Sequence, residues 1–235
     1  MSGLGDRLSA IPPAPAATGR AVRAVLWDLD GTLVDSSAYH WRSWRSVLEA
    51  EAVAVTEADF HASFGQRNEE ILSRWLGPDA DLERIRRIGA QKEACYRALL
   101  EAKGIAPLPG AAEWVRTLHE RGWRQAIASS APRLNVEAMR RALSFTRVID
   151  AVVSAEDVHA GKPDPEVFLV AAARLGVAPE RCVVVEDAAA GVEAARRAGM
   201  RSIGVGRGVV GAADVVVASL AELAPDSFDL LLVAE

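Results

Sequence analysis

From residue 111 onward the chain alternates between short apolar runs and amphipathic stretches, and this alternation is the strongest constraint on its fold. Short runs rich in valine, isoleucine and alanine predict buried strands, whereas apolar residues at three- and four-residue steps predict helices. Strands that alternate with helices form parallel βαβ units, with helices on both faces of the sheet. We therefore predict an α/β fold built on a doubly wound parallel sheet of the Rossmann type.

The predicted strands are Val22–Trp27, Arg124–Ala128, Ala151–Val153, Cys182–Val185, Arg201–Val205 and Val215–Val217. The predicted helices that connect them are Ala111–Arg121, Pro132–Leu143, Asp164–Leu175 and Ala188–Ala198. The first strand is separated from the second by a long segment whose apolar spacing is helical throughout. This segment predicts an all-helical domain inserted into the sheet domain.

The inserted segment is expected to contain a helix from Ser37 and further helices at about Arg67–Leu76 and Leu82–Ala102, with a break at Gly77–Pro78. We predict three parts: a disordered tail over residues 1–20, a core domain over 21–36 and 107–235, and a helical cap domain over 37–106. Linkers near Ser36 and Pro107 would connect the cap to the core.

Composition excludes several classes of partner. The formal net charge of −5 argues against nucleic acid or an anionic membrane as the main partner. Arg207 and Asp214 interrupt the most apolar late segment, so no membrane span is predicted. Cys95 and Cys182 have neither metal-binding nor disulfide spacing, which favours the cytoplasm. We expect a cytoplasmic monomer that acts on a small molecule.

A pair of carboxylates follows the first predicted strand directly. Residues Asp28–Thr32 read DLDGT, so Asp28 and Asp30 stand at the carboxyl end of that strand, where ligands bind in open parallel sheets. Two anionic groups held this close need a cation or a shared proton. A lone pattern of this kind also occurs as an ordinary strand end with polar turn residues, so its partners along the chain decide its meaning.

Polar residues follow or precede other strands in a chemically coherent order. The residues expected at this same edge of the sheet are Asp28, Asp30, Ser129, Ser130, Lys162, Glu186 and Asp187. Carboxylates gathered in this way favour a hard cation such as Mg²⁺. A hydroxyl group and a lysine beside them suit the oxygens of a phosphoryl group. Together these residue types predict a phosphoryl-transfer site.

This order of motifs resembles the four motifs of the haloacid dehalogenase superfamily. The resemblance rests on Asp28–Ser36, then Ser129, then Lys162, then Glu186 and Asp187, and it covers nearly the whole chain after the tail. The helical insertion is similar to the family's alpha-helical type 1 cap. The subgroup that the chain resembles most is the beta-phosphoglucomutase-like one, and its members are phosphatases or phosphomutases with an alpha-helical cap.

The resemblance implies a role for each core residue. Asp28 would be the nucleophile that forms an aspartyl-phosphate, and Asp30 would be the general acid and base, with the neighbouring carboxylate helping it to hold a proton. Mg²⁺ would be held by Asp28, the Asp30 backbone carbonyl and Asp187, with Glu186 in support. Ser129, Ser130 and Lys162 would bind the phosphoryl oxygens. Because dehalogenases of the superfamily lack the second aspartate, Asp30 favours phosphoryl chemistry.

Three residues of the inserted segment resemble substrate-site positions of beta-phosphoglucomutase: His40, Arg67 and Lys92. His40 would couple cap closure to acid–base chemistry, and Arg67 would bind a distal phosphate. The alternatives are that His40 lines a hinge, Arg67 begins a helix and Lys92 is a solvated helix residue. The segment after Ser130 departs from the mutase pattern, since neither Arg133 nor Asn135 matches the expected place.

We therefore predict a Mg²⁺-dependent phosphatase for a small phosphomonoester, with a beta-phosphoglucomutase-type phosphomutase as the alternative. A non-catalytic binding module on the same fold is a more remote alternative. Loss of Asp28, Asp30 or Lys162 would favour that module, and all three are present.

Overall fold

The computed structural model describes residues 22–63, 66–77, 79–206, 209 and 213–232. The predicted tail over residues 1–20 and the predicted break at Pro78 lie outside these ranges. Within them, the strands are β1 (Ala24–Trp27), β2 (Arg124–Ala128), β3 (Ala151–Val153), β4 (Cys182–Glu186), β5 (Arg201–Val205) and β6 (Val215–Val217). They form a parallel sheet in the order β3-β2-β1-β4-β5-β6.

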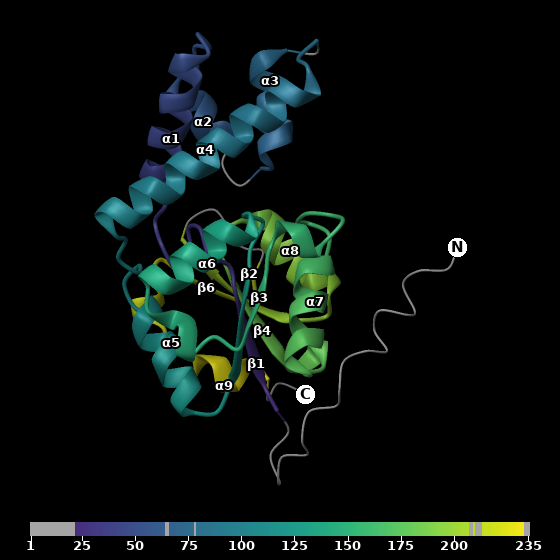
Figure 1. Ribbon diagram of the computed structural model, residues 1–235. Helices are drawn as coiled ribbons and strands as arrows, with labels where there is room; N and C mark the ends of the chain where they lie inside the picture. Colours follow the sequence, from purple (N-terminus) through teal and green to yellow (C-terminus); the bar gives the residue numbers. More distant parts are fainter. Residues whose placement is uncertain (1–21, 64–65, 78, 207–208, 210–212, 233–235) are drawn as a thin grey trace.

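Successive side chains of β1 enter two different hydrophobic layers, because side chains alternate across a strand. Val25 and Trp27 pack with α5 (Ala111–Glu120), α6 (Arg133–Ala142) and α9 (Ser227–Leu231). Ala24 and Leu26 pack with α7 (Glu166–Leu175) and α8 (Ala189–Arg197). Figure 1 shows these two groups of helices on opposite faces of the sheet. The predicted doubly wound α/β fold is confirmed.

The strand order places the ends of β1 and β4 at the centre of the sheet. From β1 the chain runs outward to β2 and β3 on one side and to β4, β5 and β6 on the other. Ligands bind in open α/β sheets at the point where the strand order reverses in this way, because neighbouring connections leave on opposite faces and open a crevice. Asp28 follows β1 and Glu186 ends β4, so both residues stand at this crevice.

The segment between β1 and β2 is helical in its described residues. It contains α1 (Ser37–Ala50), α2 (Glu57–Ser63), α3 (Asn68–Leu76) and α4 (Leu82–Lys103), which lie beyond one end of the sheet in Figure 1. These helices have a hydrophobic cluster of their own, composed of Trp44, Leu48, Phe60, Ile71, Leu72, Ile85 and Ile88. An inserted segment with its own core can keep its shape independently of the sheet.

The two connections to the helical segment lie side by side. Val34 pairs with Pro107 in an isolated antiparallel bridge, and the Leu108 backbone N–H donates to the Leu33 carbonyl oxygen at 2.8 Å. The chain therefore leaves the sheet domain and returns to it at nearly the same point.

Candidate active site

Lys162 connects the two central strands at the crevice. Its Nζ atom donates to Asp28 Oδ1 at 2.6 Å, to Glu186 Oε2 at 2.7 Å and to the Ala128 carbonyl oxygen at 3.3 Å. All three acceptors come from the ends of β1, β2 and β4, the neighbouring strands predicted to converge. The Lys162 side chain is 9% exposed, so water screens these ionic contacts only weakly.

A third carboxylate completes the acidic group. Asp28, Glu186 and Asp187 each offer an oxygen, and these oxygens lie within 4.8 Å of one another. Two glycines make this approach possible. A Cβ atom on Gly31, whose φ is +97°, would lie 2.0 Å from Asp187 Oδ2, and a Cβ atom on Gly191 would lie 2.1 Å from Glu186 Cδ. The absence of a side chain at Gly31 and Gly191 therefore leaves room for the carboxylates of Asp187 and Glu186.

The buried carboxylates hold too much negative charge for one lysine. Burial, and then the charge of Asp28, raise the pKa of Glu186 to about 8 and that of Asp187 to about 7. Burial also raises the pKa of Asp28, although Lys162 opposes the increase. Such groups ionise fully only when a further cation is near them. A set of closely spaced oxygen donors fits Mg²⁺, which prefers carboxylate ligands.

Asp30 has a different environment. Ser36 Oγ donates to Asp30 Oδ1, and His40 Nε2 lies 3.6 Å from the same oxygen. Burial alone would raise the pKa of Asp30, but the hydrogen bonds from His40 and Ser36 and the charge of His40 lower it overall. This arrangement therefore opposes the expectation that a neighbouring carboxylate helps Asp30 to hold a proton, because the donors around Asp30 outweigh the effect of burial on its pKa.

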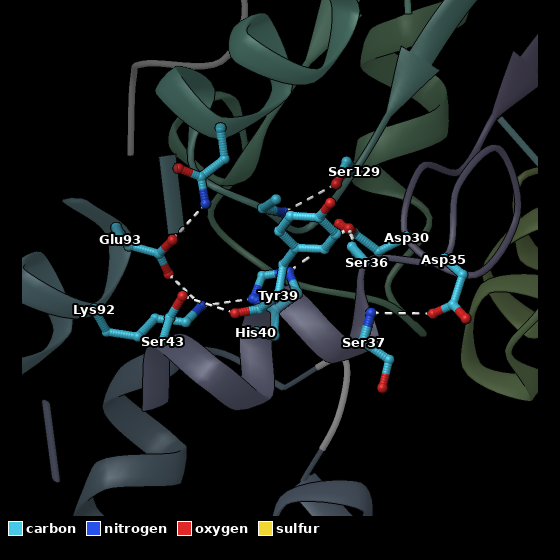
Figure 2. Close-up of polar contacts among 12 residues, drawn as sticks. Asp30, Asp35, Ser36, Ser37, Tyr39, His40, Ser43, Lys92, Glu93 and Ser129 are labelled. Carbon is cyan, nitrogen blue, oxygen red and sulfur yellow. Dashed lines mark hydrogen bonds and ion pairs between the residues drawn. The ribbon is translucent and has the colours of Figure 1, made fainter. Parts of the chain in front are cut away.

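The predicted cap residues His40 and Lys92 come together above Asp30. Lys92 Nζ lies 2.8 Å from His40 Nδ1, and it donates to Glu93 Oε1 at 2.8 Å (Figure 2). The His40 ring stacks on Tyr96 with a centroid separation of 4.3 Å. Lys92 is 2% exposed, so its interpretation as a solvated helix residue is wrong. Burial, together with the positive charge of Lys92, lowers the pKa of His40.

Ser129 and Ser130 follow β2 and face the same space as Lys162. Ser129 Oγ accepts a hydrogen bond from the Ala131 backbone N–H at 3.0 Å, and its own backbone N–H donates to the Val153 carbonyl at 3.0 Å. These bonds fix the turn after β2 and leave the Ser129 hydroxyl proton available for an acceptor. Both serines line the cleft next to Lys162.

A cleft of about 880 Å³ lies between the carboxyl edge of the sheet and the inserted helices. Its core side includes Asp28 and Lys162, and its opposite side includes Trp44, Phe60 and Arg67. A Cβ atom on Gly161 would lie 3.6 Å from Arg67 Nε, so the Arg67 side chain reaches the loop that carries Lys162. The predicted core and cap residues therefore surround one cavity.

Several residues that line the cleft or contact its lining did not follow from sequence reasoning. Glu93 is buried next to Lys92, and its carboxylate accepts from Asn68 and Asn135. Ser36 was expected as the last residue of the first motif and a linker position, without a role in the site, yet it donates to Asp30. The sequence offered one indication that Glu93 belongs to the site, namely that it follows Lys92 directly on the same predicted helix. No sequence pattern indicated the contacts of Asn135.

The residues after Ser130 that depart from the mutase pattern have other partners. Arg133 forms an ion pair with Asp157, and its backbone N–H donates to both carboxylate oxygens of Glu156. Asn135 donates to Glu93 and accepts from Arg97 Nη1 at 2.9 Å. Both side chains are thus engaged in structural contacts at the start of α6.

Comparison with known proteins agrees with this geometry. Residues 22–199 match the haloacid dehalogenase-like hydrolase family. The chain belongs to this family. The predicted resemblance is thereby confirmed, and the protein is a haloacid dehalogenase-like hydrolase with relatives that are named phosphatases of phosphorylated compounds.

Two curated relatives and one solved structure illustrate the range of similar proteins. The chain is 39% identical over 215 residues to SUPPRESSOR OF QUENCHING 1, a chloroplastic protein of Arabidopsis thaliana, and the match covers 85% of this chain but only 20% of that protein. It is 32% identical over 186 residues to the phosphorylated carbohydrates phosphatase of Thermotoga maritima, covering 77% and 84% of the two chains. The crystal structure of beta-phosphoglucomutase from Clostridium difficile superposes with a TM-score of 0.80 at 26% identity, covering 90% and 97%.

Among the described residues, none of the helices is both long and apolar enough to cross a bilayer.

Proposed function

We propose that this protein is a Mg²⁺-dependent phosphatase that hydrolyses a small phosphomonoester, such as a sugar phosphate, through an aspartyl-phosphate on Asp28. One observation carries the proposal: Lys162 bridges the buried carboxylates of Asp28 and Glu186, beside Asp187, at the floor of the cleft. A cation, a nucleophilic carboxylate and a set of metal-binding oxygens in one cavity suit phosphoryl transfer.

The metal and the phosphoryl group would share this floor. Asp28, Asp187 and the Asp30 backbone carbonyl would hold Mg²⁺, with Glu186 in support. When bound, the metal would offset the charge that otherwise keeps a phosphate dianion away from an anionic nucleophile. Ser129, Ser130 and Lys162 would bind the phosphoryl oxygens, because all three line the cleft together with Asp28 and have hydroxyl or ammonium groups.

The chemistry would proceed in two steps. First, an Asp28 carboxylate oxygen attacks phosphorus, the bond from phosphorus to the leaving oxygen breaks, and Asp30 gives that oxygen a proton. Second, water attacks phosphorus while Asp30 takes its proton, and inorganic phosphate leaves as the Asp28 carboxylate re-forms. Asp30 would thus alternate between the protonated form that the first step uses and the ionised form that the second step uses, and His40 and Ser36 favour the ionised form.

The inserted helices would act as a specificity cap over this site. We propose residues 37–106 as the cap domain and residues 21–36 and 107–235 as the core domain, connected by the paired linkers at Val34 and Pro107. His40, Arg67 and Lys92 reach the cleft from the cap side. Closure of the cap would exclude bulk water from the phosphoryl group. A cytoplasmic location and a monomeric state remain predictions.

Phosphomutase activity is the second candidate. Arg67 lines the cleft opposite the proposed phosphoryl site, so it could bind a second phosphate of a sugar bisphosphate, and a beta-phosphoglucomutase is among the structural neighbours. Phosphatase activity is favoured because Arg133 and Asn135, the two candidates to replace the mutase's residues after the serine motif, are committed to Asp157 and Glu93.

A screen of phosphorylated metabolites tests the proposal. Purified protein is incubated with each compound and Mg²⁺, and released phosphate is measured, with Asp28→Asn as the matched control because it is nearly isosteric. We expect phosphate release from small phosphomonoesters by the parent protein and none by Asp28→Asn. Interconversion of beta-glucose 1-phosphate and glucose 6-phosphate without net phosphate release would instead establish the mutase. Equal phosphate release by Asp28→Asn would remove Asp28 from the nucleophile role.

A further inference from the structure

Glu93 is a buried carboxylate that faces three donors. Its side chain lies on α4 and is 7% exposed as a residue. Oε1 accepts from Lys92 Nζ at 2.8 Å and from Asn68 Nδ2 at 2.6 Å, and Oε2 accepts from Asn135 Nδ2. Both of its oxygens are therefore occupied by protein donors, so Glu93 acts on the site through its neighbours.

The first neighbour, Lys92, connects Glu93 to the general acid and base. An ammonium group can only donate, so the contact of Lys92 Nζ with His40 Nδ1 at 2.8 Å makes Nδ1 the acceptor. The ring proton of neutral His40 then lies on Nε2, which faces Asp30 Oδ1 (Figure 2). Glu93 thus holds the ammonium that determines which nitrogen of His40 carries the proton.

The second neighbour, Asn135, connects Glu93 to the core. Asn135 lies in the first turn of α6, shortly after Ser129 and Ser130, and is 2% exposed. It donates to Glu93 and accepts from Arg97 Nη1 at 2.9 Å, and both of these partners belong to α4. Polar contacts therefore join the inserted helices to the core at two places: His40 contacts Asp30, and Glu93 and Arg97 contact Asn135.

We propose that Glu93 is a positioning residue, which together with Asn135 forms a latch that fixes Lys92 and His40 over Asp30 when the inserted helices sit against α6. The latch makes the acid–base geometry depend on the placement of these helices, because a displacement that separates Glu93 from Asn135 also withdraws His40 from Asp30. The expected effect of the latch on kcat rests on the proposed phosphatase function, whereas its expected effect on the tautomer of His40 does not.

The structural consequence is tested by the tautomer of His40. Protein labelled with ¹⁵N on its histidines is examined by NMR, with His40→Gln used to assign the His40 signals. We expect neutral His40 to carry its proton on Nε2 in the parent protein and a mixture of tautomers in Glu93→Gln, because glutamine offers one acceptor oxygen to three donors. Glu101→Gln is the matched control, since Glu101 is an exposed glutamate of the same helix. An unchanged tautomer in Glu93→Gln would overturn the proposal.

The kinetic consequence is tested with p-nitrophenyl phosphate and Mg²⁺. Glu93→Gln and Asn135→Ala should each lower kcat by about 10- to 100-fold, the usual effect of losing a hydrogen bond to a charged group, with KM changed by less than about threefold. The double variant should be no slower than the slower single variant, because both changes open the same latch. Multiplicative losses in the double variant, or parental kcat in Glu93→Gln, would overturn the latch.

The two readouts separate this inference from the proposed function. If the parent protein released no phosphate in the metabolite screen while Glu93→Gln changed the His40 tautomer, the proposed function would fail and the latch would stand. If the parent protein were active and Glu93→Gln matched it in both readouts, the latch would fail and the proposed function would stand. Asn135→Ala provides the tautomer measurement if Glu93→Gln does not fold.

Discussion

Replacing Lys162 with methionine would remove the ammonium between Asp28 and Glu186 while keeping most of the buried side-chain volume. The side chains of these three residues are 9%, 10% and 2% exposed, so water cannot take over the role of the ammonium. Breaking a buried ion pair by removing one partner costs about 3–5 kcal/mol. For a chain of this length, such a loss lowers Tm by on the order of 10 °C.

The loss should depend on pH in a defined direction. Burial and the charge of Asp28 raise the pKa of Glu186 to about 8 even with Lys162 in place, and removing the ammonium raises it further. At pH 6 the carboxyls relieve the repulsion by binding protons, whereas above pH 8 they must ionise without a partner. Lys162→Met should therefore be more destabilising at pH 8.5 than at pH 6, and Asp28→Asn in the same chain should restore part of the lost stability.

Thermal unfolding in metal-free buffer, followed by circular dichroism, measures these effects for the parent, both single variants and the double variant. We also expect Lys162→Met to lower kcat by about 10²–10³-fold, as for the loss of one donor to a developing anion. The reasoning would be refuted by a parental Tm for Lys162→Met at pH 8.5. It would equally be refuted if Asp28→Asn lowered the Tm of Lys162→Met still further.

Three other perturbations probe the same site. Gly31→Ala should raise the Mg²⁺ concentration for half-maximal activity at least about tenfold, because the added Cβ atom would displace Asp187. Gly77→Ala is the control for backbone strain alone, since Gly77 has a φ of +91° and open space around it. An equal effect of the two substitutions would contradict the role of Asp187 in binding the metal. The pKa values of about 8 for Glu186 and about 7 for Asp187 lie above those of unfolded carboxyls, so the metal-free protein should lose stability as pH rises from 5 to 8. Calorimetry should therefore show that Mg²⁺ raises Tm more at pH 8 than at pH 6. An equal increase in Tm at both pH values would argue against Glu186 and Asp187 as metal ligands. Arg67→Ala should raise KM for substrates with a second anionic group while leaving kcat/KM for p-nitrophenyl phosphate within about twofold; equal losses for both would place Arg67 at the reacting phosphate instead.

The sheet could be predicted from the sequence because its strands are short, continuous apolar runs with clear ends. The described bounds of β2, β3, β5 and β6 are the predicted ones, and β1 begins two residues later than expected, at Ala24. The helices α2 and α9 were missed because each is short and buries few side chains. Phe228 of α9 nevertheless packs against Trp27 and Trp114, which is a tertiary contact without a local pattern.

The residues at the centre of the site could be predicted because they lie at the ends of strands, and the order of strands and polar residues can be read directly from the sequence. Asp28, Lys162 and Glu186 meet because parallel strands bring their carboxyl ends to one edge. The lowered pKa of Asp30 and the contacts of Asn135 could not be predicted, because both depend on how the inserted helices sit against the core. Local spacing carries no information about that placement.

Trapping the covalent intermediate tests the central claim most directly. The protein is mixed with a turned-over phosphomonoester and Mg²⁺, quenched in acid during the steady state, and digested for mass spectrometry. We predict a phosphorylated peptide containing Asp28 that disappears once substrate is exhausted and that is absent from Asp28→Asn. Sustained phosphate release with no phosphoryl group on Asp28 at any quench time, together with activity in Asp28→Asn, would contradict the proposed mechanism.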